Sequence, residues 1–213
     1  MRRRRPWGCG GVFAAVLIFL WCFLCIKAKK ARKKKLCYNL YMKWKWKKGE
    51  HLYYEGLFRK LQEDKVKYLL IGGVAVNLWG IERATKDIDL ALAMDKDNIL
   101  RFVKSVKELG FTPKVPVEPE ELADPQKRKE WQEEKNMLVF SFQHLENPYI
   151  LIDIMVNNPL AFDQMYARKV EIDSRGIKLP VAAVDDIIKL KEIAGREQDL
   201  SDIEALKRFV KGE

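Results

Sequence analysis

The segment from residue 68 to residue 92 constrains the fold of this chain more than any other part of its sequence. A short apolar run ends at Gly72-Gly73, a second ends at Gly80, and a third follows Asp87. The pattern predicts a buried strand over residues 66–71, a short helix over 74–79 and a strand over 88–92. Strand, helix and strand in this order indicate an α/β domain.

Two aspartates flank Ile88 on the second predicted strand. Because side chains alternate along a strand, Asp87 and Asp89 point to the same side while Ile88 faces the core. Two carboxylates so close together repel each other unless a cation lies between them. Mg²⁺ commonly binds one or two carboxylates together with substrate phosphates. The pair therefore predicts a site for Mg²⁺ or Mn²⁺.

The residues around this pair predict a phosphate site. Gly72 and Gly73 open the short helix, where backbone N–H groups without nearby side chains can bind phosphate. Arg83 and Lys86 add positive charge, and Thr85 can donate a hydroxyl. A Gly-Gly turn or an Asp-x-Asp pair is common by itself, but their order within 25 residues is specific.

The string GGVAVNLWGIERATKDIDL resembles the first motif of the DNA-polymerase-beta-like nucleotidyltransferase superfamily. It is most similar to the form found in abortive-infection nucleotidyltransferase toxins. The commoner superfamily form is Gly-Ser, so the phosphate contact of that Ser would here fall to the Gly73 backbone. The resemblance implies transfer of a nucleoside monophosphate from a nucleoside triphosphate (NTP) to a hydroxyl of RNA, protein or a small molecule, and a cognate antitoxin as partner.

The resemblance also requires a third carboxylate on a neighbouring strand. Asp153 fits, because it is the single charge in the apolar run 149–156. Burying an unpaired carboxylate among apolar side chains costs considerable free energy. Asp153 would then be a second metal ligand or the general base, with Asp87 and Asp89 bridging two metal ions. The alternative is a structural partner for a buried Lys or Arg.

The last third of the chain carries a Lys-containing helix followed by Arg-x-x-Asp-x-x-Asp, which also resembles these proteins. Lys189 is the position that matches a nucleotide-binding Lys, and Lys191 competes with it from another helix face. Arg196, Asp199 and Asp202 could equally be structural. In that case Asp199 would cap the last helix and Arg196 would pair with Asp202.

The remaining patterns predict the rest of an α/β (α+β) nucleotidyltransferase fold, a mixed β-sheet flanked by helices with a C-terminal helical pair. Apolar spacing favours a helix over 51–63, and Asp97 could cap a helix that runs to Leu109. A loop with a polar helix near 125–134 precedes strands over 137–143 and 149–156. A hairpin over 169–181 and helices over 184–194 and 200–210 complete the domain, which we place at residues 50–213.

The N-terminal segment, residues 1–49, differs sharply from this domain. It holds 15 of the 40 Lys and Arg and none of the 30 acids, so residues 50–213 carry a net charge of −5. The total of +10 therefore does not indicate a basic surface for nucleic acid. Residues 6–26 contain no charge and are just long enough for a transmembrane helix. Seven positive charges follow and four precede them, which favours a cytoplasmic domain anchored to the inner face of the membrane.

A simpler explanation of the N-terminal segment is that translation starts at Met42 and that the upstream residues are an over-extended reading frame.

All four cysteines lie before residue 38, so the domain needs no disulfides and suits a reducing cytoplasm. Cys22 and Cys25 have CxxC spacing but lie in an apolar run without a second pair, which favours packing over zinc.

Two other functions compete with an active enzyme. A catalytically silent relative would act as a binding partner in a toxin–antitoxin or defence pair, and the intact set of Asp87, Asp89 and Asp153 argues against it. A membrane-associated scaffold would depend on the N-terminal segment alone. The acceptor and the preferred nucleotide do not follow from the sequence.

Overall fold

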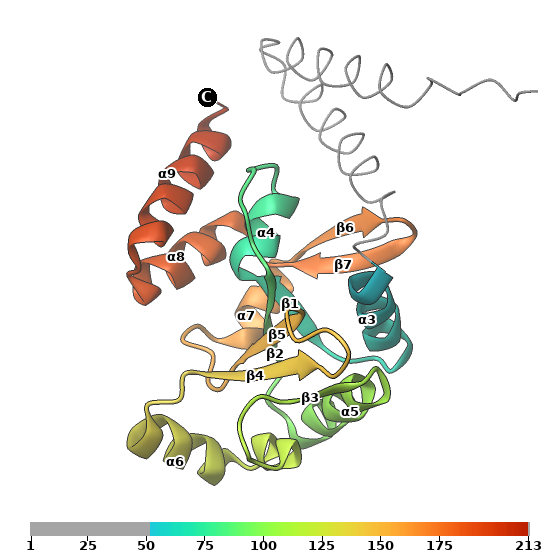
Figure 1. Ribbon diagram of the computed structural model, residues 1–213. Helices are drawn as coiled ribbons and strands as arrows, with labels where there is room; N and C mark the ends of the chain where they lie inside the picture. Colours follow the sequence, from blue (N-terminus) through green and yellow to red (C-terminus); the bar gives the residue numbers. More distant parts are fainter. Residues whose placement is uncertain (1–51, 213) are drawn as a thin grey trace, which may run out of the picture. The chain divides into compact units, whose positions relative to one another are not determined.

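The computed structural model describes residues 52–212 (Figure 1). The basic segment, the apolar run at 6–26, Met42 and the four cysteines lie outside the described residues. Within residues 52–212, no helix is both long and apolar enough to cross a membrane.

Seven strands form one mixed sheet in the order β3-β4-β5-β2-β1-β7-β6. The pairs β2–β5 and β1–β7 are parallel, and the other neighbours are antiparallel. The strands are β1 (Tyr68–Ile71), β2 (Asp87–Leu92), β3 (Phe111–Pro113), β4 (Val139–His144), β5 (Leu151–Met155), β6 (Val170–Ser174) and β7 (Ile177–Val181). The predicted mixed sheet flanked by helices is confirmed.

The helices form two groups around this sheet. Helices α3 and α5 contact each other, and α5 also contacts β3 and the 3₁₀ helix η2, whereas α4 contacts β1, β2 and α8, and α8 contacts α9 (Figure 1). Their bounds are α3 (Leu52–Glu63), α4 (Gly72–Leu78), α5 (Lys96–Glu108), η2 (Pro119–Ala123), α6 (Pro125–Lys135), α7 (Phe162–Ala167), α8 (Val184–Ala194) and α9 (Glu197–Lys211). The C-terminal helical pair is therefore present as expected.

The core follows from the alternation of the strands. In β4 and β5 every second residue is buried, and the residues between them are partly exposed. Phe140, Phe142, Ile152 and Ile154 are fully buried, and Phe142 makes an edge contact with Phe102 of α5. The opposite face of these two strands, which carries Asp153, is left partly open to solvent.

One predicted helix cap differs from the structure, and three short elements were not predicted. The N-cap of α5 is Asp95, whose side chain accepts a hydrogen bond from the Asn98 N–H at 2.9 Å, so the prediction of Asp97 as the cap was wrong. Asp97 lies in the first turn of the helix, where its negative charge interacts favourably with the helix dipole. The short elements β3, η2 and α7 were missed, because a strand of three residues and helices of five or six residues are too short to show their own periods.

Candidate active site

The three predicted carboxylates lie on two neighbouring strands. Strands β2 and β5 are parallel and their register pairs Asp89 with Asp153, while Asp87 lies two residues before Asp89 on the same face. Electrostatic repulsion connects all three, because Asp87 and Asp153 both raise the pKa of Asp89. The chain thus brings two segments 64 residues apart to one point of the sheet.

The two glycines after β1 lie directly against this point. Ile71 pairs with Asp89, so Gly72 and Gly73 begin α4 beside the Asp89 carboxylate. Gly72 has a φ of +61°, and a Cβ there would lie 1.9 Å from Asp89 Oδ2. The Gly73 N–H donates a hydrogen bond to the same oxygen at 3.3 Å. Only glycine, which has no side chain, allows the backbone at residue 72 to approach Asp89 this closely.

Gly73 leaves room for two other predicted site residues. A Cβ on Gly73 would lie 2.6 Å from Thr85 Oγ1 and 2.8 Å from Arg83 Nη1. The Thr85 hydroxyl thus occupies space that a serine side chain at position 73 would need. Lys86 is exposed next to them, and its backbone carbonyl accepts a hydrogen bond from the Tyr54 hydroxyl at 2.7 Å.

Burial dominates the electrostatics of the carboxylates. It raises the pKa of Asp89 to about 6, against a lowering by the Gly73 hydrogen bond and a further raising by Asp153 and Asp87. Burial also raises the pKa of Asp153, partly offset by Ser141 on the neighbouring strand β4. Asp153 Oδ1 is buried and has no hydrogen-bond partner among residues 52–212. Such an orphaned oxygen suits a bound cation.

The donor set fits a divalent cation, although the carboxylates are not pre-assembled around one. In the described part of the chain, no three His, Cys, Asp or Glu side chains are close enough together to hold a metal ion as they stand. The Asp89 carboxylate is engaged with Gly73 instead.

Arg83 is fixed at both its backbone and its side chain. The Asn77 side chain accepts from the Arg83 N–H at 2.8 Å and donates to its carbonyl at 2.9 Å. Arg83 Nη1 pairs with Asp202 of α9 at 3.1 Å. Asn77 was not found from the sequence, because a side chain that binds the backbone six residues away has no periodic signature.

The structure separates the two competing lysines. Lys189 is exposed, whereas Lys191 is buried and donates to Asp199 at 2.8 Å and to Asp202 at 2.7 Å. Lys191 is thus the lysine of α8 that lies beside the partner of Arg83. The role of Lys189 in nucleotide binding stays a prediction.

The structural details predicted for the start of α9 were wrong. Arg196, not Asp199, occupies the N-cap position, and Asp199 lies inside the first turn. Arg196 pairs with Asp199 at 2.9 Å rather than with Asp202. The spacing i,i+3 brings Arg196 next to Asp199, whereas Asp202 faces Arg83 and Lys191.

Two further residues interact electrostatically with the carboxylates and were not found from the sequence. Asp87 raises the pKa of Tyr54 in α3, which is already raised by burial. Lys114 lowers the pKa of Asp153 in part, against the larger raising effect of burial. Both come from segments that only the folded sheet brings to the site.

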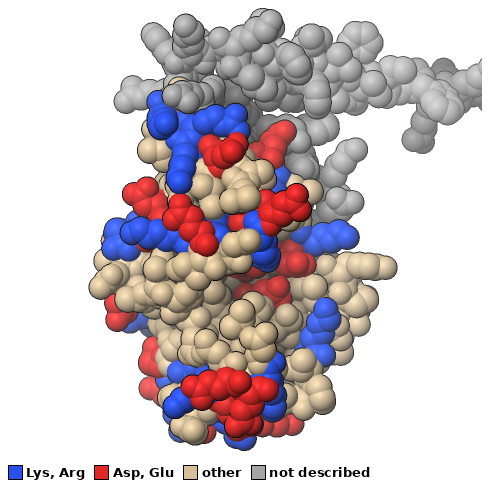
Figure 2. All heavy atoms as spheres, turned by 90° about the vertical axis from the view of Figure 1, so that its left-hand side faces the viewer, with Lys and Arg blue, Asp and Glu red and all other residues tan. Residues whose placement is uncertain are grey.

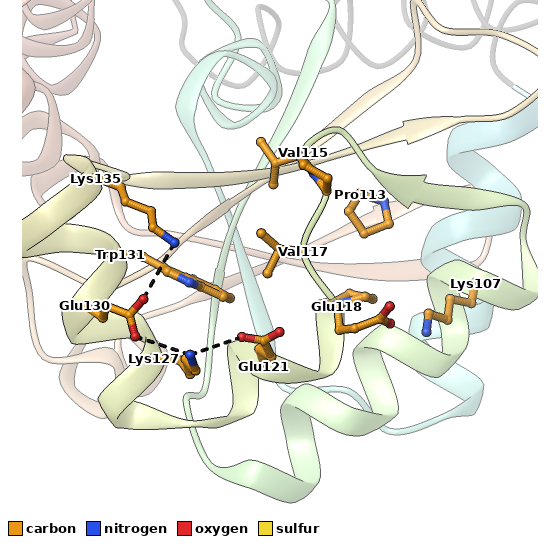
Figure 3. A pocket seen from close by; sticks show the side chains of 12 residues that line it. Lys107, Pro113, Val115, Val117, Glu118, Glu121, Lys127, Glu130, Trp131 and Lys135 are labelled. Carbon is orange, nitrogen blue, oxygen red and sulfur yellow. Dashed lines mark hydrogen bonds and ion pairs between the residues drawn. The ribbon is translucent and has the colours of Figure 1, made fainter.

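A hollow of about 640 Å³ lies between residues 113–119 and α6 (Figure 3). Lys127 pairs there with Glu121 and Glu130, so charged side chains that line the hollow neutralise one another. Pro113 and Val115 line the hollow, while Lys114 between them acts on Asp153. The segment 113–115 thus separates the hollow from the carboxylates.

Comparison with known proteins agrees with this geometry. Residues 56–209 match the family described as "Nucleotidyl transferase AbiEii toxin, Type IV TA system". The chain belongs to the AbiEii nucleotidyltransferase family. The match includes α4, the loop before β2, β2, β5 and α8, which together carry every predicted site residue.

Solved structures of other nucleotidyltransferases resemble this AbiEii-family chain at low sequence identity. The lincosamide antibiotic adenylyltransferase LnuA, solved with lincomycin bound, is 20% identical, with 70% of this chain and 90% of that chain covered and a TM-score of 0.47. A putative nucleotidyltransferase from Thermotoga maritima is 15% identical, with 75% and 91% covered and a TM-score of 0.46. A search of curated proteins found no match.

Proposed function

We propose that this chain is a metal-dependent nucleotidyltransferase that moves a nucleoside monophosphate from an NTP to an acceptor hydroxyl. One observation carries the proposal. Asp89 and Asp153 are register partners on parallel strands, Asp87 shares their face, and Asp153 Oδ1 is buried without a partner in residues 52–212. Three carboxylates in this arrangement are costly for a fold and useful for binding cations.

The triphosphate would bind at the start of α4. The backbone N–H groups of Gly72 and Gly73 lie there beside the Arg83 guanidinium and the Thr85 hydroxyl. The Gly73 N–H now donates to Asp89 and would donate to a phosphate oxygen once Asp89 turns toward the cation. Lys86, exposed in the same loop, adds a second positive charge.

The carboxylates Asp87, Asp89 and Asp153 would hold Mg²⁺ or Mn²⁺, which when bound neutralises the triphosphate and favours ionisation of the acceptor hydroxyl. Burial raises the pKa of Asp153, so it is a better proton acceptor than an exposed carboxylate. Asp153 would take the proton of the acceptor hydroxyl. A new oxygen–phosphorus bond forms at the α-phosphate as the bond to the pyrophosphate breaks.

We propose further that the chain acts as the toxin of a toxin–antitoxin or defence pair, with a cognate antitoxin protein as partner. The family match supports this role. The acceptor would be RNA, protein or a small molecule. Figure 2 shows Lys and Arg mixed with Asp and Glu over the described residues of one face, so that face offers no continuous basic stripe to a long nucleic acid.

The test is an incubation of the full-length chain with each labelled NTP, Mg²⁺ or Mn²⁺, and either bulk RNA or a cell extract. We expect label transfer that is lost by at least about 100-fold in Asp87→Asn, because metal ligands contribute several kcal/mol to such reactions. Asp163→Asn, an exposed acid of α7, is the matched control and should transfer normally. Wild-type protein that neither transfers label nor binds any NTP would instead be a silent binding partner.

We propose a cytoplasmic location for the domain, since residues 50–213 contain no cysteine and suit a reducing compartment. Whether residues 1–49 hold it at the inner face of the membrane is a separate prediction. Fractionation of cells that carry the native gene, with N-terminal sequencing of the product, tests it. A product that begins at Met42 and is found in the soluble fraction would end the anchor hypothesis.

A further inference from the structure

A series of ion pairs connects the Arg83 loop to the two C-terminal helices. Arg83 pairs with Asp202 at 3.1 Å, and Lys191 pairs with Asp202 at 2.7 Å and with Asp199 at 2.8 Å. Arg196 ends the series by pairing with Asp199 at 2.9 Å. The five residues come from the loop before β2, from α8 and from the start of α9.

The middle of this cluster is buried and Arg196 at one end reaches outward, whereas the side chain of Arg83 at the other end is only 17% exposed. The side chains of Lys191, Asp199 and Asp202 are 5%, 2% and 7% exposed, whereas that of Arg196 is 73% exposed. Two carboxylates face three cations, so the cluster keeps an excess positive charge. Buried ion pairs with several hydrogen bonds fix geometry well, since any rotation would strand a buried charge.

Arg196 has a defined direction despite its exposure. It contacts Asp199 through Nε, which leaves the two terminal nitrogens of the guanidinium pointing away from Asp199. Its charge reaches the carboxylate site: burial raises the pKa of Asp89 most strongly, and Arg196 is the arginine that counteracts this rise. Arg196 is joined to Arg83 of the phosphate site through Asp199, Lys191 and Asp202, and this series of ion pairs links its charge to the site.

Arg83 lies at the other end of the cluster, next to the glycines. Its Nη1 is 2.8 Å from where a Gly73 Cβ would be, and Asn77 fixes its backbone. The buried cluster thus places one guanidinium beside Gly73 and connects a second, that of Arg196, to it through ion pairs. Guanidinium groups bind phosphate oxygens with directed, charge-assisted hydrogen bonds.

We propose that Arg196 is a second phosphate-binding arginine, which together with Arg83 binds the β- and γ-phosphates that leave as pyrophosphate. Lys191, Asp199 and Asp202 are the positioning residues that hold the two guanidinium groups. The inference rests on the proposed function and names residues that bind the leaving group. Its ligand is the pyrophosphate moiety, whatever the base or the acceptor.

The competing explanation is that Arg196 only neutralises Asp199. Asp199 keeps Lys191 as a partner in either case, so loss of the exposed Arg196 should cost little stability. A purely structural role would leave the affinity for pyrophosphate unchanged. Affinity for pyrophosphate therefore separates the two explanations.

The test is calorimetric titration of inorganic pyrophosphate, with MgCl₂ present, into full-length wild type and the variants Arg196→Ala and Arg196→Lys. Arg208→Ala is the matched control, because Arg208 is an exposed arginine of the same helix and pairs with Glu204. We expect Arg196→Ala to weaken pyrophosphate binding about 10- to 100-fold, the usual effect of charge-assisted hydrogen bonds. Arg196→Lys should recover part of the loss, and Arg208→Ala should bind normally.

A second measurement separates this inference from the proposed function. The KM for the NTP should rise in Arg196→Ala, while binding of the matching nucleoside monophosphate, which lacks the two phosphates, should not change. Equal pyrophosphate affinity in wild type and Arg196→Ala would overturn the role of Arg196, as would a wild type that transfers label without binding pyrophosphate. A wild type that neither transfers label nor binds pyrophosphate would refute both proposals.

Discussion

At the scale of single residues, Gly72 has the least freedom to change. It combines a positive φ with the closest approach of any described glycine to a side chain, since a Cβ there would lie 1.9 Å from Asp89 Oδ2. A non-glycine residue would strain the left-handed backbone and would also displace a carboxylate of the site. Gly176 has a similarly positive φ of +79°, but nothing lies within 4 Å of where its Cβ would be.

We therefore expect Gly72→Ala to lower the free energy of unfolding by about 3 kcal/mol, from backbone strain together with overpacking. Gly176→Ala should cost only about 1 kcal/mol, since it carries the backbone strain alone. Urea denaturation of both variants measures the difference. Equal losses in the two variants would show that Asp89 moves aside without cost.

At the site, some residues could be predicted from the sequence and others could not. The spacing of Asp87 and Asp89 predicted their common face. The family resemblance implied a third carboxylate, and Asp153, the lone charge in an apolar strand, fitted it. Tyr54 and Lys114 could not be found in this way, because their proximity depends on how α3 and the segment after β3 pack. Thr85 was assigned to phosphate, but its place beside Gly73 became visible only in the folded chain.

At the scale of elements, α8 presents two lysines on different sides. Lys191 faces α9 and holds two buried carboxylates, whereas Lys189 faces solvent. Helical periodicity separates these faces, but the sequence alone did not show which face meets α9. The strands and helices with a clear periodic pattern were predicted correctly. The short β3, η2 and α7 were missed because too few residues carry a pattern in them.

Lys191→Met should lower the free energy of unfolding by about 3 to 5 kcal/mol, because Asp199 and Asp202 would lose their shared buried cation. Lys189→Ala should change it by less than about 0.5 kcal/mol, as is usual for an exposed side chain. Thermal unfolding compares the two variants. A Lys191→Met variant as stable as wild type would contradict the buried ion-pair cluster.

Lys189→Ala also tests the sequence-based assignment of this residue. If Lys189 binds the nucleotide, the Kd for the NTP rises in the variant although its stability does not change. Calorimetric titration of the NTP into both proteins measures this Kd. An unchanged Kd would remove Lys189 from the site.

At the scale of the whole molecule, the carboxylate site lowers stability when no cation is bound. Burial raises the pKa of Asp89 to about 6, so the folded state binds its proton more tightly than the unfolded state does. Between about pH 4, the value for an unfolded Asp, and about pH 6, the contribution of Asp89 to the free energy of unfolding falls as pH rises. The raised pKa of Asp153 acts in the same direction.

Without metal, Asp89→Asn should therefore be more stable than wild type at pH 7 by on the order of 2 kcal/mol, and the advantage should vanish near pH 4. Asn keeps an oxygen that can accept the Gly73 hydrogen bond. Thermal unfolding of both proteins in EDTA across this pH range measures the effect. A constant difference between them at all pH values would contradict it.

Mg²⁺ should raise the melting temperature of wild type at neutral pH, and this effect should weaken as the pH falls, because protons compete with the cation for the Asp89 carboxylate, whose pKa is raised by burial. Asp89→Asn should respond less to Mg²⁺ at every pH. Thermal unfolding with and without MgCl₂ measures both responses. A shift in wild type that is the same at every pH, or as large in Asp89→Asn, would mean that the cation binds elsewhere.

The buried link between Arg83 and Asp202 also orders events in time. During synthesis, a chain that has emerged as far as β5 already carries all three carboxylates and both glycines. It still lacks the aspartates that hold Arg83, Lys191 and Arg196, because these belong to α9. In a nascent chain, the arginines that we propose to bind phosphate therefore lack their carboxylate partners until this late helix has been made.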